Sequence, residues 1–125
     1  NVNSYLSFSN TSAQPLYKFQ PRQNSFGTGS DNSYYVWVKA RNKGTTATTI
    51  GVKLQKNGTM ITNQTISNIS GNTWKYYRVE ATGQPASFSN LTVGETHDVI
   101  LSPGSTDIEI DSIYLTPKAN LILTP

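Results

Sequence analysis

The chain of 125 residues lacks cysteine, which excludes both a disulfide framework and thiolate chemistry. It also has one histidine and seven acidic residues, so general acids, general bases and metal ligands are scarce. No apolar run approaches the about 20 residues that a membrane-spanning helix needs. The net charge is only +3, and no nucleic-acid-binding motif accompanies the ten Lys and Arg residues. These shortages predict neither a membrane span nor a nucleic-acid partner, and they favour a binding or structural domain over an enzyme.

Residues that form strands are abundant. Seven Tyr, four Phe and two Trp stand among many Val, Ile and Thr, which are the residue types enriched in β-sheets. Ser, Thr and Asn supply much of the rest, a composition that suits sheets facing water and loops rich in turns. The length is near the commonest size of one domain. We therefore predict a single all-β domain over residues 1–125.

Alternation of apolar and polar residues with period two predicts the strands, and no helical periodicity lies between them. The predicted strands are 34–41, 49–55, 59–66, 74–81, 96–101 and 107–115, with shorter alternating pieces at 2–8 and 16–19. Asn57-Gly58, between two alternating runs, is the strongest hairpin signal. Regularly spaced strands without helices predict an antiparallel β-sandwich of the jelly-roll kind. The end of the chain, 117–125, fits either a last strand or a linker stub.

The segment 34–41 is the best pointer to function. Its alternation places Tyr34, Val36, Val38 and Ala40 on one face and Tyr35, Trp37, Lys39 and Arg41 on the other. The first face is a core face. No packing requirement puts two aromatic and two cationic side chains in a row on a solvated surface, so the second face is predicted to bind a ligand.

Three carboxylates cluster in the run Asp107-Ile108-Glu109-Ile110-Asp111. A strand projects all three acids to one side while the isoleucines enter the core. The acids fit three roles: a solvated face paired with Lys or Arg, oxygen ligands of calcium, or the paired carboxylates of a glycosidase. The apolar residues Ile113 and Leu115 have the opposite parity from the isoleucines, which predicts either a β-bulge near Asp111 or burial of both faces.

Exposed aromatic rings are the other chemical resource, because the C–H faces of sugars stack on Trp and Tyr while polar side chains bind the hydroxyls. The candidates are Tyr17, Phe26, Tyr35, Trp37, Trp74 and Tyr76. His97 is a weaker candidate for chemistry, since no nucleophile motif and no second metal ligand can be paired with it. A structural role of His97 is therefore favoured.

The order of several segments resembles carbohydrate-binding modules of the family 6, 35 and 36 group. The matching pieces are Tyr-Tyr-Val-Trp-Val-Lys-Ala-Arg (34–41), Ile-Gly-Val-Lys-Leu (50–54), Gly-Asn-Thr-Trp-Lys-Tyr-Tyr-Arg-Val (71–79), Val-Gly-Glu-Thr-His-Asp-Val-Ile-Leu (93–101) and Ile-Glu-Ile-Asp-Ser-Ile-Tyr-Leu (108–115). The resemblance implies a galactose-binding-like β-sandwich. The last piece also looks like the lectin-like third domain of insecticidal crystal toxins.

The resemblance also implies functional residues. Trp74 matches the aromatic residue that stacks on a sugar in a loop cleft, with Tyr34 or Tyr35 facing it, and Asp111 matches a ligand of structural calcium. The family usually opens with a Glu-Ala-Glu piece that supplies further calcium ligands. This chain has no acid before Asp31. The calcium ligands that this chain can offer are therefore Asp111, Glu109 and Asp107, without the N-terminal ligands of the family.

From the sequence we expect a non-catalytic domain that binds a polysaccharide or oligosaccharide, is extracellular or secreted, and is tethered to a catalytic domain that acts on the same glycan. Two sites compete: a loop-end cleft around Trp74, suited to neutral β-glycans, and the sheet face around Trp37. Cations at Lys39 and Arg41, with Lys53 on the next strand, predict uronic or sulfated glycans for the second site. The alternative from a different class is a structural or adhesive β-sandwich domain of a surface fibre or toxin.

Overall fold

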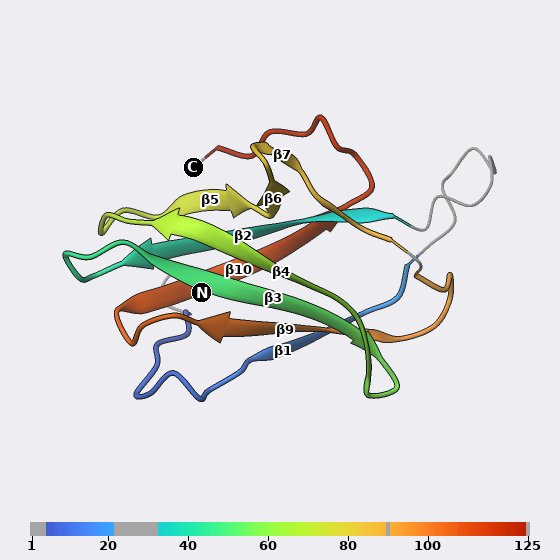
Figure 1. Cartoon of the computed structure of the whole chain (residues 1–125), viewed down its shortest axis with the longest axis horizontal. Helices are drawn as coiled ribbons and strands as arrows, with labels where there is room; N and C mark the ends of the chain where they lie inside the picture. The colour runs from blue at the N-terminus through green and yellow to red at the C-terminus, as the bar shows by residue number, and fades with distance from the viewer. Residues whose placement is uncertain (1–4, 22–32, 90, 125) are drawn as a thin grey trace.

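The computed structural model describes residues 5–21, 33–89 and 91–124, and in these ranges it contains strands and no helix (Figure 1). All strand pairs are antiparallel, so the prediction of an all-β chain with antiparallel sheets is confirmed. No helix of the described ranges is long and apolar enough to span a membrane. The strands are β1 Leu16–Phe19, β2 Tyr34–Asn42, β3 Thr48–Lys56, β4 Thr59–Ile69, β5 Lys75–Arg78, β6 Glu80–Ala81, β7 Gln84–Pro85, β8 Ser87–Phe88, β9 His97–Pro103 and β10 Ile108–Thr116.

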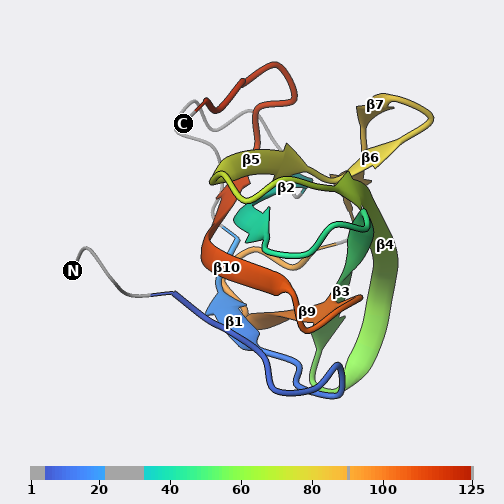
Figure 2. The same cartoon turned by 90° about the vertical axis from the view of Figure 1, so that its left-hand side faces the viewer.

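The strands form two larger sheets and one small hairpin. In the β3 sheet the order is β1-β9-β3-β4, and in the β2 sheet it is β10-β2-β5, with β8 paired to the start of β2. The hairpin consists of β6 and β7. Figure 2 shows the β2 sheet along one side of the molecule and the β3 sheet along the other. The chain passes from one sheet to the other between β1 and β2, β2 and β3, β4 and β5, β8 and β9, and β9 and β10.

One hydrophobic core is shared by both sheets. The inward residues predicted for two central strands are fully buried: Val36, Val38 and Ala40 of β2, and Ile50, Val52 and Leu54 of β3. Each fully buried Val, Leu or Ile side chain stabilises the fold by about 1.5–3 kcal/mol. Burial of these faces leaves the opposite faces of both sheets as the surfaces on which a ligand site can form.

A β-bulge interrupts β10, as its parity break predicts. The register between β10 and β2 shifts between Ile110 and Ser112, so Asp111 is the extra residue. The shift lets Ile108 and Ile110 on one side of the bulge, and Ile113 and Leu115 on the other, all pack in or against the core. At the same point Leu6 forms two backbone hydrogen bonds with Ile110, of 2.8 and 3.0 Å.

The hairpin predicted at Asn57-Gly58 is present between β3 and β4. Both residues have positive φ, 52° for Asn57 and 78° for Gly58. That is the requirement of a type I′ turn, whose twist matches the twist of the flanking strands.

Other boundaries differ from those predicted. The predicted strand 74–81 is split at Val79 into β5, which pairs with β2, and β6, which pairs with β7. No strand occurs in 117–124, so of the alternatives left open for this end of the chain, a last strand is absent from those residues. The strands β7 and β8 were not predicted. The predicted loop residue Phe26 lies outside the described residues.

Candidate ligand-binding site

The outer face of the β2 sheet collects aromatic and cationic side chains from four segments. Register fixes their neighbours: Lys39 of β2 stands opposite Tyr76 of β5, and Trp37 stands opposite both Arg78 of β5 and Tyr114 of β10. We use the name aromatic face for the side chains of Tyr5, Lys39, Arg41, Trp74, Tyr76 and Tyr114. It includes the cationic half of the row predicted on β2 and adds rings from elsewhere in the chain.

The rings of the aromatic face form two edge-to-face pairs. The Tyr5 and Trp74 centroids are 5.6 Å apart with an interplanar angle of 62°, and those of Tyr76 and Tyr114 are 5.7 Å apart at 63°. Such geometry adds about 0.5–1.5 kcal/mol per pair beyond burial of the rings. Tyr5 and Tyr114 remain 43% and 45% exposed, and Trp74 and Tyr76 are half-buried. Ring surface is therefore available to a ligand at both pairs.

Cations from β2 lie against these rings. The guanidinium carbon of Arg41 is 4.4 Å from the Trp74 centroid and 5.2 Å from that of Tyr5. The Lys39 Nζ is 5.4 Å from the Tyr76 centroid. These distances fall within the about 6 Å range of cation–π attraction, so the cations hold the rings in place along the sheet.

The carboxylates of β10 neutralise the same cations. Glu109 is 4% exposed; it accepts a hydrogen bond of 2.7 Å from Arg41 Nε and lies 3.5 Å from Lys43 Nζ. Asp111 lies 3.5 Å from Lys39 Nζ. The arrangement matches the first role proposed for the acidic run, an acidic strand face paired with Lys and Arg.

Asp107, the third acid of the run, is exposed just before β10, with its backbone N–H bonded to the Ser105 hydroxyl. Within the described ranges no group of three or more His, Asp or Glu side chains is placed to hold a metal. A calcium site at Asp107, Glu109 and Asp111 stays a prediction. Calcium would have to displace the Lys and Arg partners of the last two.

Trp37 does not present an exposed ring, and the expectation that it does is wrong. Its parity is as predicted, but it is only 5% exposed. The Arg78 guanidinium carbon lies 5.3 Å from the ring centroid, and Arg78 is held by Glu80 at 2.9 Å and by the Ala119 carbonyl at 3.5 Å. Figures 1 and 2 both show the C-terminal segment beyond β5 on this side of the molecule.

The Trp37 indole N–H has no hydrogen-bond partner among the described residues. The ring forms part of a second pocket of about 390 Å³ at the edge between β4 and β5. With its face covered by Arg78, Trp37 acts as a packing residue beneath the sheet surface.

The tyrosines predicted to face Trp74 are placed elsewhere. Tyr34 points inward; its ring meets Phe19 at 5.7 Å and its backbone pairs with Phe88. Tyr35 lies on the outer face, half-buried, opposite Thr116. Lys53 belongs to the β3 sheet, where it stands opposite Asn63 and Ile100, so it does not extend the row of Lys39 and Arg41.

The two rival sites of the sequence analysis are one surface. Trp74 immediately precedes β5 and stacks on Arg41, so it lies on the outer face of the β2 sheet with the predicted cations. Trp74, Lys39 and Arg41 are brought together, whereas Trp37 and Tyr34 are not available on that surface.

His97 has a structural environment. It is completely buried, its Nδ1 lies 2.8 Å from the Glu95 carbonyl, and its Nε2 accepts a 3.2 Å hydrogen bond from the Thr92 N–H. The ring therefore bridges two backbone groups of the loop before β9. This is the role that the sequence analysis favours.

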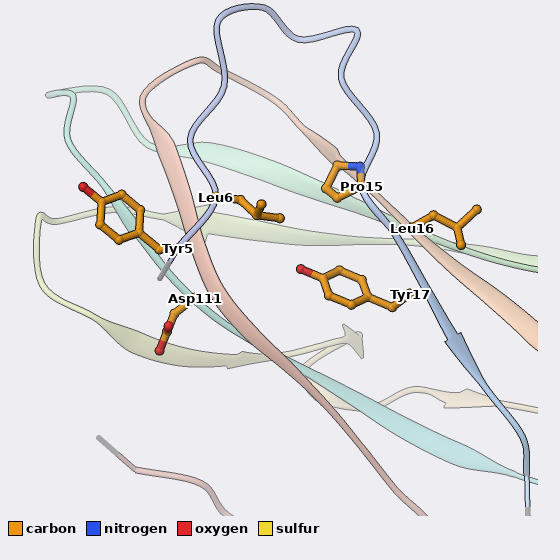
Figure 3. A pocket seen from close by; sticks show the side chains of 6 residues that line it. All are labelled: Tyr5, Leu6, Pro15, Leu16, Tyr17 and Asp111. Atoms are coloured by element: carbon orange, nitrogen blue, oxygen red, sulfur yellow. The ribbon is translucent and has the colours of Figure 1, made fainter. Parts of the chain in front are cut away.

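A pocket of about 510 Å³ adjoins the aromatic face, lined by Tyr5, Leu6, Pro15, Leu16, Tyr17 and Asp111 (Figure 3). It lies where the N-terminal segment bridges to β10 and then returns as β1. Burial raises the pKa of the Tyr17 phenol above its ordinary value, and the negative charge of Asp111 adds to the rise. Sequence reasoning named Tyr17 and Asp111 but missed Leu6, Pro15 and Leu16, because exposed aliphatic residues carry no motif.

Comparison with known proteins gives no match. No protein-family model fits the chain, and neither a curated protein nor a solved structure resembles it significantly. The resemblance to carbohydrate-binding modules therefore stays a prediction, and the geometry of the aromatic face carries the functional argument.

Proposed function

We propose that this chain is a non-catalytic domain that binds a neutral polysaccharide or oligosaccharide on its aromatic face. The observation that carries the proposal is a row of two edge-to-face ring pairs, each with a cation against one of its rings: Arg41 against Trp74 and Lys39 against Tyr76. Sugar rings offer apolar C–H faces to aromatic side chains and hydroxyls to charged ones. A row of this kind presents aromatic rings and charged side chains next to one another across the sheet.

The charge pairing of the face favours neutral glycans. Lys39 and Arg41 each have a carboxylate partner on β10, and Arg78 at the edge of the sheet is paired with Glu80. A glycan carboxylate or sulfate would have to compete with these partners for the cations. Sugar hydroxyls, in contrast, both donate and accept hydrogen bonds, so they interact with such pairs without separating them.

The fold is consistent with the same proposal. Two antiparallel sheets around one core, with a chain that crosses repeatedly between them, support a β-sandwich of the jelly-roll kind. We propose that the domain works outside the cell and tethers a catalytic domain to its glycan. Such a tether raises the effective concentration of the enzyme at its substrate.

Affinity electrophoresis in gels containing soluble polysaccharides tests the proposal. The panel includes neutral xylan, mixed-linkage glucan and galactomannan, with alginate and pectate as acidic members. We expect at least one neutral glycan to retard the domain, and Trp74→Ala to abolish the retardation. Met60→Ala is the control, because Met60 is 57% exposed on β4 of the other sheet.

Circular dichroism and thermal unfolding of each variant separate loss of binding from loss of fold. Absence of retardation by every glycan would contradict the proposal, as would retardation that persists in both Trp74→Ala and Tyr114→Ala. Repeating the gels with a chelator tests calcium at Asp107, Glu109 and Asp111, since a calcium-dependent site loses binding when the metal is removed.

A further inference from the structure

Two residues connect the pocket to the aromatic face: Tyr5 belongs to both, and Asp111 pairs with a cation of the face. The Tyr5 ring lines the pocket and also pairs with Trp74. Asp111 lines the pocket, and its carboxylate pairs with Lys39. A glycan lying along the aromatic face would therefore reach the mouth of the pocket at its Tyr5 end.

Two residues of the N-terminal segment, Leu6 and Pro15, line the pocket. Figure 3 shows this segment looping from Leu6 to Pro15, just before β1. Two backbone hydrogen bonds between Leu6 and Ile110 hold this segment to β10. The Leu6 side of the pocket is therefore anchored to the β2 sheet.

The lining has an apolar part and a polar part. Leu6 and Leu16 remain 39% and 45% exposed, and Pro15 lies between them in Figure 3. The polar groups are the Asp111 carboxylate and the Tyr17 phenol, whose hydroxyl is turned away from β1 toward the side of Tyr5 and Asp111. Within the described part of the chain, the Tyr17 hydroxyl has no hydrogen-bond partner. Burial of the phenol also raises its pKa.

We propose that this pocket binds a sugar residue that carries a methyl group. The methyl group packs against Leu6, Pro15 and Leu16, while hydroxyls of the same sugar donate to Asp111 and bond to the Tyr17 phenol. The volume of about 510 Å³ lies in the range of about 300–1,000 Å³ typical of small-ligand sites. The inference rests on the proposed function and specifies which glycans the domain selects.

Two kinds of sugar supply such a methyl group: 6-deoxy sugars and N-acetylated amino sugars. Matched pairs distinguish them. The methyl glycosides of L-fucose and L-galactose, and of L-rhamnose and L-mannose, differ only in the 6-deoxy methyl. Those of N-acetylglucosamine and glucose differ in the acetamido group. Burial of one methyl group favours binding by a factor of about 4, so the methyl-bearing member of at least one pair is expected to bind about fourfold more tightly.

The experiment measures dissociation constants for each pair by NMR titration of the intact domain. In the variant Leu16→Ala we expect the preference within the pair to fall toward one, because the apolar wall is lost. In Tyr17→Phe we expect the affinities for both members of a pair to fall together, because the phenol hydroxyl hydrogen-bonds sugar hydroxyls that both members have. Met60→Ala is the control and retains both the affinity and the preference. Leu16 is 45% exposed, so its truncation is expected to leave the fold intact, which thermal unfolding checks.

The outcomes separate this inference from the proposed function. Glycan retardation that depends on Trp74, combined with equal binding within every pair, overturns the methyl-sugar pocket and leaves the proposed function standing. A preference that Leu16→Ala does not change also overturns the pocket. Loss of all glycan binding in the unmodified domain overturns both.

Discussion

Glu109 is the buried partner of Arg41, one of the two cations of the aromatic face. Its carboxylate is 4% exposed and accepts a 2.7 Å hydrogen bond from Arg41. Glu109→Gln keeps the size of the side chain but leaves the Arg41 charge without its partner. Because Arg41 retains 25% of its side-chain exposure, water offsets part of the loss. We expect the free energy of unfolding, measured in urea, to fall by about 2 kcal/mol.

Glu95→Gln is the matched control for this prediction. Glu95 also pairs with a cation, Lys56 at 3.3 Å, but its side chain is 52% exposed. Exposed pairs contribute about 0–1 kcal/mol, so the control is expected to lose less than half as much stability as Glu109→Gln. Equal losses in the two variants would show that Glu109 is not the buried anchor of the face.

The two tryptophans show what residue-level reasoning can reach. Strand parity correctly puts Trp37 on the outer face of β2, but parity does not say whether that face is covered. Trp37 is covered because Arg78, its cross-strand neighbour on β5, lies over its ring and is held there by the Ala119 carbonyl. The sequence alone does not indicate this cover, since Ala119, which holds Arg78 in place, lies in a segment without periodicity.

At the scale of the element, the bulge in β10 gives the next prediction. It lets Ile108 and Ile110, and then Ile113 and Leu115, face the core from one strand. Deletion of Asp111 removes the extra residue and turns one of these two pairs toward water. Two aliphatic side chains lost from the core cost about 3–6 kcal/mol. We expect the deletion variant to unfold at far lower urea concentration, or to fail to fold.

Asp111→Ala separates the backbone role of this position from its charge. The substitution keeps the length of β10 and removes only the pair with Lys39, in which both side chains are partly exposed. A loss of less than about 1 kcal/mol is expected. If deletion and substitution were equally mild, the bulge would not be what sets the register of β10.

Elements with a period were predictable, and elements without one were not. The bulge followed from the parity of two isoleucines against Ile113 and Leu115, and the β3–β4 hairpin followed from Asn57-Gly58. The unpredicted strands β7 and β8 have two residues each, which is too short for alternation to be visible. Their positions depend on tertiary contacts such as the hydrogen bond between the Ala86 N–H and the Val79 carbonyl.

At the scale of the whole molecule, the candidate site is assembled by the register of the β2 sheet. From the sequence, Trp74 was predicted in a loop-end cleft, Lys39 and Arg41 on a separate sheet face, and Tyr76 in neither site. Only the pairing of β2 with β5 and β10 brings them into one row. Tyr5 joins through the bridge of Leu6 to Ile110, a contact across more than a hundred residues that no local pattern indicates.

The paired charges of this row determine how binding should depend on salt. Each cation of the row already has a carboxylate partner, so binding of a neutral glycan separates no charges and attracts none. We expect its dissociation constant to change less than about twofold between about 0.1 M and 1 M salt, although the Debye length falls from about 10 Å to about 3 Å. Isothermal titration calorimetry on a glycan that retards the domain measures the change.

Glu109→Gln supplies the contrast that makes this prediction discriminating. In that variant Arg41 loses its partner and becomes available to a glycan carboxylate through a charge-assisted hydrogen bond. Alginate or pectate, bound weakly or not at all by the unmodified domain, is then expected to bind measurably, and raising the salt should weaken that binding. A steep salt dependence already present in the unmodified domain, with alginate or pectate preferred over the neutral glycans, would mean that Glu109 and Asp111 do not neutralise the face. The original expectation of uronic or sulfated glycans would then be the better one.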